Sequence, residues 1–342
     1  MLPQSALGRR GPTRRGLLAS VVAAFGLILA APAAPARAQG GSEGGGQGGY
    51  QIVGTVGMVT DIVQQVAGDR AQVRGMMGPG VDPHLYKPTR NDIRMLISAD
   101  VIFANGLLLE GKLSDALIRA ARSGKKVFPV AELLDKQFLL EPAEFDGLYD
   151  PHVWMDPSAW AKAVEAIRDK LAEHDPRGRD TYTANAEALL KQINELDAYA
   201  EKVLTSVPEG QRVLVTAHDA FNYFGRRYGY EVVGIQGLST ESEAGVRDIE
   251  RLVSLLVDRK IKAVFVESTV SQRNIRALIE GTAARGHTVV VGGELFSDAM
   301  GQPGTYEGTY LGMIDHNASV IARALGGDVP AGGMQGKIAD LP

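Results

Sequence analysis

The sequence predicts an α/β protein of two lobes, each with a mainly parallel, helix-flanked sheet, bridged by one long rigid helix. Two stretches, 51–175 and 208–328, alternate short apolar runs with segments of helical apolar spacing, which favours parallel, helix-covered sheets. Between them, Leu189 to Leu204 keeps helical spacing with no glycine. A helix of about 25 residues would be roughly 35–40 Å long, so we interpret it as a rod joining the lobes. An ordinary surface helix of one large domain is the alternative.

In the first stretch, apolar runs predict strands at 52–56, 71–77, 101–104 and 126–130. Helical spacing predicts helices at 59–66, 88–98, 112–121 and 156–173. Pro88 suits the first turn of its helix, where a backbone N–H is not needed. Residues 138–149 have no regular pattern.

The second stretch repeats this organisation without a clear sequence repeat. Strands are expected at 212–217, 231–235, 261–266 and 288–291. Helices are expected at 219–228, 244–258, 271–285 and about 305–325. Gly229 is a candidate C-cap, and His218 lies where a strand gives way to a helix. Ligands bind at this carboxyl end of strands in α/β sheets.

The first 38 residues have the composition of a secretory signal. Four arginines precede an apolar stretch from Leu17 to Ala31, and Ala36-Arg37-Ala38 fits a cleavage site. As a membrane anchor this apolar stretch is too short to span comfortably. Arg14-Arg15 also resembles a twin-arginine signal, so export by the Sec or the twin-arginine route is expected. The expected division is a signal peptide (1–38), a glycine-rich linker (39–50), an N-terminal lobe (51–175), a linker helix (176–207), a C-terminal lobe (208–328) and a tail (329–342).

Composition excludes several classes of function. The chain has no cysteine, so it has no disulfide, no thiolate metal site and no lipid-anchoring cysteine. A soluble periplasmic protein is therefore expected. Removing the five arginines of residues 1–38 lowers the formal charge from −4 to −9. A protein this acidic has no electrostatic basis for binding nucleic acid.

Three of the six histidines lie in loops beside proline, aspartate or glycine, where side chains tend to converge on a cleft. These are His84, His152 and His218, and Asp298 lies in a similar loop. Three imidazoles and a carboxylate on four loops suit one closed metal site. The other three, His174, His287 and His316, are interpreted as surface or packing residues.

The tripeptide Asp-Pro-His occurs twice, ending at His84 and at His152. Proline stiffens the turn from which each histidine projects. The nearby Asp82, Asp150 and Asp219 are candidates to orient the imidazoles, or to form turns and helix caps.

Taken in order around the long helix, several segments resemble the TroA-like metal receptors of ABC importers over about residues 51–325. They are DPHLYKPTRNDI, NGLLLEGKL, DPHVWMDP, VTAHDAFNYFGRRYG, GLSTESEAGVRDI, VFVESTVS and ELFSDAMG. The resemblance implies a metal in the cleft between the lobes, bound by His84 and His152 from the first lobe and by His218 and Asp298 from the second. It also implies that Glu267, Asp156 and Asp248 are helpers or structural ion-pair residues.

The function that follows is a periplasmic receptor that captures a divalent metal and delivers it to an inner-membrane permease. Its mechanism is binding and release, not catalysis, and a monomer is expected. Manganese and zinc are the candidate metals, with iron as a third. Histidine at position 218 suits zinc, whereas zinc receptors often carry a histidine-rich loop, and no histidine lies between Gly111 and Pro151. Affinity is expected to fall as the pH drops through about 6.

Two other classes of function remain open. One is a zinc hydrolase that uses the same histidines, with Asp298 or Glu267 as base. The chain has no HExxH motif and no GxSxG motif, which argues against it. The other is a metal-binding adhesin or a metal buffer with the same fold.

Overall fold

The computed structural model describes residues 49–342 except 146, 340 and 342. The expected signal peptide and nearly all of the expected linker lie outside the described residues. Contacts group Gly46–Pro342 into one compact unit. Among the described helices, none is both long and apolar enough to cross a membrane.

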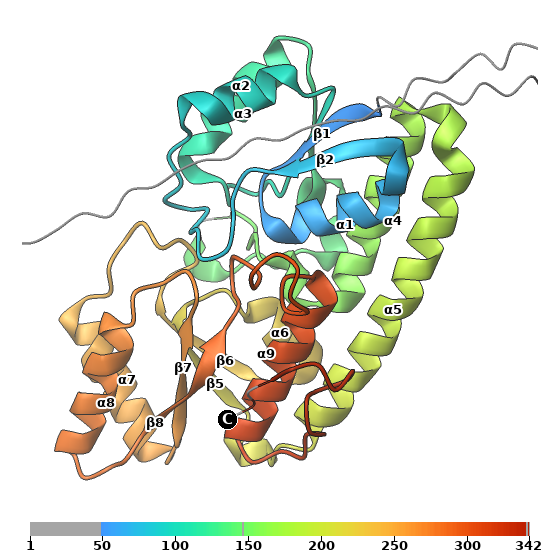
Figure 1. Cartoon of the computed structure of the whole chain (residues 1–342). Coiled ribbons are helices and arrows are strands. Elements are labelled where there is room, and N and C mark those ends of the chain that lie inside the picture. The colour runs from blue at the N-terminus through green and yellow to red at the C-terminus, as the bar shows by residue number, and fades with distance from the viewer. Residues whose placement is uncertain (1–48, 146, 340, 342) are drawn as a thin grey trace, which may run out of the picture. The chain divides into compact units, whose positions relative to one another are not determined.

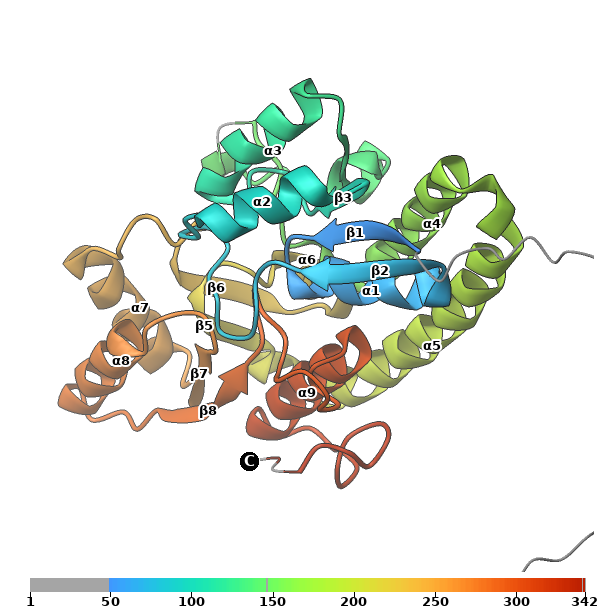
Figure 2. The ribbon, with the colours of Figure 1, turned by 45° about the horizontal axis from the view of Figure 1, so that its top comes forward.

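The first half contains a four-stranded parallel sheet with the strand order β2-β1-β3-β4. Its strands are β1 (Tyr50–Gly54), β2 (Ala71–Gly75), β3 (Val101–Ala104) and β4 (Lys126–Pro129). Its helices are α1 (Gly57–Ala67), α2 (Arg90–Ser98), α3 (Ser114–Arg122) and α4 (Pro157–His174). Helices α2 and α3 lie together on one side of the sheet, and α1 lies on the other (Figure 2). This is the helix-covered parallel sheet that the sequence predicts.

Two helix starts show how local chemistry sets the element boundaries. The Asp156 side chain accepts the backbone N–H of Ser158 at 3.0 Å, so α4 begins with Pro157 at its first position as expected. At α2, Thr89 and Asp92 form a reciprocal capping box, so the helix begins at Arg90. The expectation that Pro88 occupies the first turn is wrong, because the cap lies after it.

Helix α5 (Arg179–Thr205) has 27 residues, which corresponds to about 40 Å at 1.5 Å per residue. It packs against α1 and α4 of the first half and against α9 (Tyr310–Ala324) of the second. Figure 1 shows it running along both halves. Its buried residues, among them Leu189, Ile193 and Leu196, form one stripe. The long bridging helix is therefore confirmed.

The second half differs from expectation in its sheet. The four strands form two parallel pairs, not one ladder: β5 (Val213–His218) with β6 (Glu231–Gln236), and β7 (Ala263–Glu267) with β8 (Val290–Leu295). Strands β5 and β7 are neighbours, but at their carboxyl ends the Glu267 side chain accepts the backbone N–H of His218 at 2.8 Å. There the Glu267 carboxylate, and not a backbone carbonyl of β7, accepts this N–H.

The helices of the second half are α6 (Asn222–Tyr228), α7 (Val246–Asp258), α8 (Arg273–Ala284) and α9. Gly229 ends α6 with a φ of 73°, a left-handed conformation that glycine adopts without strain, as its position suggests. Helix α9 starts later than expected, because the Thr309 side chain caps it by accepting the N–H of Gly312.

The main apolar core is continuous from the first sheet, through α4 and α5, to α6 and α9. A second, smaller core lies between the β5–β8 strands and helices α7 and α8. The first core therefore ties the two halves together around α5. The domain boundaries expected from the sequence stay a prediction.

Replacing Ile193 by alanine tests how much the buried stripe of α5 contributes to the free energy of unfolding. Ile193 is completely buried, so Ile193→Ala should lower the free energy of unfolding by about 2–5 kcal/mol in urea titrations. Lys191→Ala, an exposed change two residues away, should alter it by less than about 0.5 kcal/mol. Equal effects of the two changes would show that α5 is not anchored by this stripe.

Candidate metal centre

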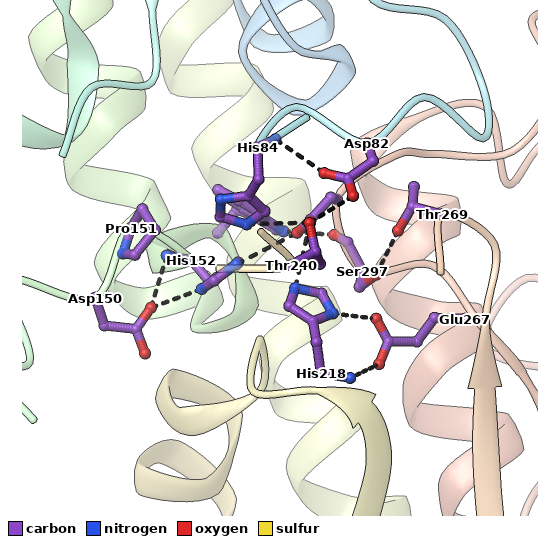
Figure 3. Close-up of polar contacts among 12 residues, drawn as sticks. Asp82, His84, Asp150, Pro151, His152, His218, Thr240, Glu267, Thr269 and Ser297 are labelled. Carbon is purple, nitrogen blue, oxygen red and sulfur yellow. Dashed lines mark hydrogen bonds and ion pairs between the residues drawn. The ribbon is translucent and has the colours of Figure 1, made fainter. Parts of the chain in front are cut away.

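The structure brings the four residues predicted from sequence into one buried cluster. His84 lies in the loop after β2, His152 just ahead of the short 3₁₀ helix Val153–Met155, His218 at the last position of β5, and Asp298 in the loop after β8. Each offers one potential metal-binding atom, and these atoms lie within 4.8 Å of one another. Figure 3 shows the three imidazoles converging from separate segments.

The inner atoms of this cluster make no hydrogen bonds with the described residues. The Nε2 atoms of His84 and His152 lie 3.4 Å from the Asp298 carboxylate oxygens, and that of His218 lies 3.2 Å away. All three Nε2 atoms and both carboxylate oxygens are buried without a hydrogen-bond partner. Unpaired buried polar atoms are rare in folded proteins. Three imidazole nitrogens and a carboxylate are a donor set that fits a divalent transition metal.

Two of the three imidazoles are hydrogen-bonded to a carboxylate through Nδ1, on the side of the ring that faces away from the centre. Asp150 accepts both the ring Nδ1–H and the backbone N–H of His152, at 2.8 and 2.9 Å. Glu267 does the same for His218 with its two oxygens. Each contact assigns the proton to Nδ1 and leaves Nε2 free to face the centre. Asp150 and Glu267 therefore orient imidazoles, one of the roles expected for them.

His84 is held differently. The Asp82 carboxylate accepts the backbone N–H of His84 at 2.9 Å and the hydroxyl of Thr240 at 2.6 Å. Asp82 therefore positions the loop and not the imidazole, which agrees with the second of its two expected roles, that of a turn-forming residue. Asp219 is also not an imidazole partner, because its carboxylate accepts from Asn222 at 3.0 Å.

Sequence reasoning assigned no structural role to the segment 105–111, which supports both histidines of the first half. Buried Glu110 accepts from Thr55 and from the backbone N–H of Asn105, at 2.8 and 2.6 Å. The Asn105 side chain in turn donates to the carbonyl of Pro151, next to His152, at 3.1 Å. No local pattern indicates that a glutamate in this leucine-rich loop is buried.

Gly111 brings the same segment against the His84 loop. A Cβ at Gly111 would lie 2.2 Å from the carbonyl oxygen of His84, and its φ is +43°. Only glycine permits this close approach without displacing the loop. The 105–111 segment therefore contacts the His84 backbone and the carbonyl of Pro151, which precedes His152.

The remaining candidates lie outside the cluster, as expected. Asp156 caps α4 and pairs with Arg226 at 3.1 Å, and Asp248 accepts the backbone N–H of Gly245 at 3.2 Å. His287 and His316 contact backbone carbonyls through Nε2, and His174 ends α4.

Neighbouring charges shift the protonation of the cluster. Burial by itself lowers the pKa of His152, but Asp150 and Asp298 outweigh it and raise the pKa to about 9. Burial also opposes a charge on His218, yet Glu267 and Asp298 hold its pKa well above the usual value. The pKa of Asp298 lies well below its usual value, because the imidazoles outweigh burial. Without a metal, protons on His152 and His218 supply positive charge beside Asp298.

Comparisons with known proteins place this centre in context. The family model described as zinc-uptake complex component A, periplasmic, matches residues 52–324. The manganese-binding lipoprotein MntA of Bacillus subtilis is 46% identical over 275 residues, covering 80% of this chain and 89% of MntA. The iron-binding protein YfeA of Yersinia pestis is 32% identical over 285 residues, covering 81% of this chain and 86% of YfeA.

The zinc-binding protein TroA of Treponema pallidum is similar in both sequence and structure. It is 43% identical over 291 residues, covering 84% of this chain and 93% of TroA. Its solved structure superposes with a TM-score of 0.79 and covers 81% of this chain and 99% of that one. The relatives are metal-binding solute receptors and not enzymes. With its family model matched over most of its length, the chain belongs to the family of periplasmic metal-binding solute receptors typified by the zinc-uptake component A and TroA.

Proposed function

We propose that this protein captures a divalent transition metal through His84, His152, His218 and Asp298 and delivers it to the permease of an ABC importer. The observation that carries the proposal is the set of buried, unpartnered atoms that these four side chains direct at one point. A cation bound there would satisfy all of them at once.

In this function the chain binds and releases, and it performs no covalent chemistry. The three Nε2 atoms and the Asp298 carboxylate contact the cargo, while Asp150 and Glu267 hold two imidazoles in the required tautomer. Four protein groups would complete a four-coordinate site and would leave no position for a reactive water. This argues against the zinc hydrolase, and no contact in the described residues favours an adhesin or a buffer.

The transported metal is proposed to be manganese or zinc, with iron as the third candidate. The relatives named for manganese, zinc and iron are all similar to this chain. Three imidazoles suit zinc and a carboxylate suits manganese, and zinc binds most N/O sites more tightly than manganese. Cellular metal supply is therefore part of the selectivity, and tight zinc binding alone does not identify the cargo.

The location and partners complete the proposal. Residues 1–38 would direct export to the periplasm by the Sec or twin-arginine route, and no cysteine is present to carry a lipid. The receptor would meet an inner-membrane permease there as a monomer.

The decisive experiment is to measure the metal content of protein purified from the periplasm. Mass spectrometry should find about one equivalent of manganese, zinc or iron. Stripped protein should bind Mn²⁺ and Zn²⁺ in separate titrations with the same stoichiometry. Absence of stoichiometric metal under every condition would overturn the proposed function.

His218→Ala should reduce metal affinity by at least about 100-fold, because losing even an outer-shell partner of a metal site costs 10–100-fold. Chelator competition measures the affinity, and circular dichroism checks that the fold persists. His174→Ala, at the distant end of α4, is the matched control and should leave affinity unchanged. An unaltered affinity in His218→Ala would remove that residue from the site.

Metal affinity should keep rising with pH between 7 and 9. The pKa of His152 in the metal-free protein is about 9, and a bound metal requires Nε2 without its proton. Below that pH, binding must release the proton, so affinity should rise by up to about tenfold per pH unit for each proton released. The fall expected near pH 6 is thus moved upward by Asp150 and Asp298. Competition titrations at several pH values would show a flat profile from 7 to 9 if this reasoning is wrong.

A further inference from the structure

Several hydrogen bonds join the two halves near the centre, and one of them reaches the His84 loop. This bond runs from the Thr240 hydroxyl, in the loop 237–245 between β6 and α7, to the Asp82 carboxylate at 2.6 Å. Thr240 is 7% exposed. The other oxygen of the same carboxylate accepts the backbone N–H of His84. Figure 3 shows Thr240, Asp82 and His84 as one connected group. The position of His84 is therefore linked to a loop of the other half.

The three imidazoles differ in how they are fixed. His152 and His218 are each held at Nδ1 by a carboxylate and are 0% exposed. His84 has no hydrogen bond to its ring among the described residues and is 3% exposed. Its place depends on its loop, through Asp82 and through the close approach of Gly111. Of the three imidazoles, His84 can move with the least loss of hydrogen bonding.

A cavity of about 450 Å³ borders His84. The Thr240 loop forms one side of it through Leu238, Ser239 and Glu241, and the 105–111 segment forms another through Leu107 and Leu108. Movement of the Thr240 loop would therefore widen the space next to His84. A separate cavity of about 470 Å³ borders Asp298 instead, and it is lined by the start of α1 and by methionines.

We propose that Thr240 is a positioning residue that sets how long the metal stays bound. Its hydroxyl holds Asp82, and Asp82 holds the His84 loop in place for the cargo. When this hydrogen bond breaks, His84 leaves the metal first and the cation departs through the cavity beside it. The inference rests on the proposed metal-binding function and adds the residue that governs release.

The test compares metal release from three variants with that from wild type. Thr240→Val removes the hydroxyl and keeps the shape of the side chain, whereas Thr240→Ser keeps the hydroxyl. Thr269→Val is the matched control, because it removes a threonine hydroxyl that contacts Ser297, next to Asp298, at 3.2 Å and has no link to His84. Zn²⁺-loaded protein is mixed with an excess of a fluorescent zinc chelator, and the dissociation rate is followed by stopped flow.

Thr240→Val should release Zn²⁺ about tenfold faster, the factor expected for losing one hydrogen bond to a charged group. Thr240→Ser should be close to wild type, and Thr269→Val should stay within about twofold. The association rate should be nearly unchanged, and the melting temperature of metal-free Thr240→Val should fall no further than that of Thr269→Val, which separates positioning from general destabilisation.

Two outcomes would overturn the inference while leaving the metal site intact. A dissociation rate in Thr240→Val equal to that of wild type would show that the metal leaves without opening this bond, for example on the Asp298 side. Equal acceleration in Thr269→Val would show that any loosening of the centre speeds release. Failure of wild type to bind Zn²⁺, Mn²⁺ or Fe²⁺ at all would instead overturn the proposed function itself.

Discussion

The centre of this protein buries three imidazoles and one carboxylate whose inner atoms have no hydrogen-bond partner among the described residues. Removing such groups from water is unfavourable unless other contacts compensate for it. Here hydrogen bonds on the outer side of the centre compensate. Asp150 and Glu267 accept from imidazole Nδ1 atoms, and Asp82 accepts the backbone N–H of His84. The outer atoms of the centre are therefore hydrogen-bonded, whereas its inner Nε2 and carboxylate atoms are not. A bound cation would provide the missing contacts of the inner atoms.

A shared apolar core connects the segments that carry these loops. The main apolar core continues from the first sheet through α4 and α5 to α6 and α9, so the two halves share packed side chains and are not joined by a flexible linker. Close-packed cores resist gradual deformation. Local loop movement at the centre therefore needs less disruption than movement of one half against the other.

A receptor must hold its cargo and also give it up. The supports of the centre reflect both needs, because two imidazoles are fixed by charged partners while His84 is positioned only through its loop. The family relationship agrees with these two needs, since the family model is described as a zinc-uptake component and the relatives are named for the metal that they bind. The similarity to manganese, zinc and iron receptors also shows that one scaffold serves several metals.

Much of the fold was predictable from sequence because it depends on local patterns. Apolar runs and helical spacing located these strands and α-helices to within a few residues, and the long glycine-free run became α5. Helices α2 and α9 start later than expected because threonine side chains cap them. The sequence also singled out four residues that the structure brings together in one cluster, because proline, aspartate and glycine mark the loops that carry them.

The sequence by itself therefore determined the elements, their order and the side chains available for a metal centre. Only the tertiary structure decided how those side chains are supported. Asp82 and its partner Thr240 are 158 positions apart in the sequence, and His218 and its partner Glu267 are 49 apart. The burial of Glu110 and the division of the second sheet into two pairs likewise follow from contacts between distant segments. Spacing along one chain carries no information about such pairs, because they form only when separate loops are packed against one another.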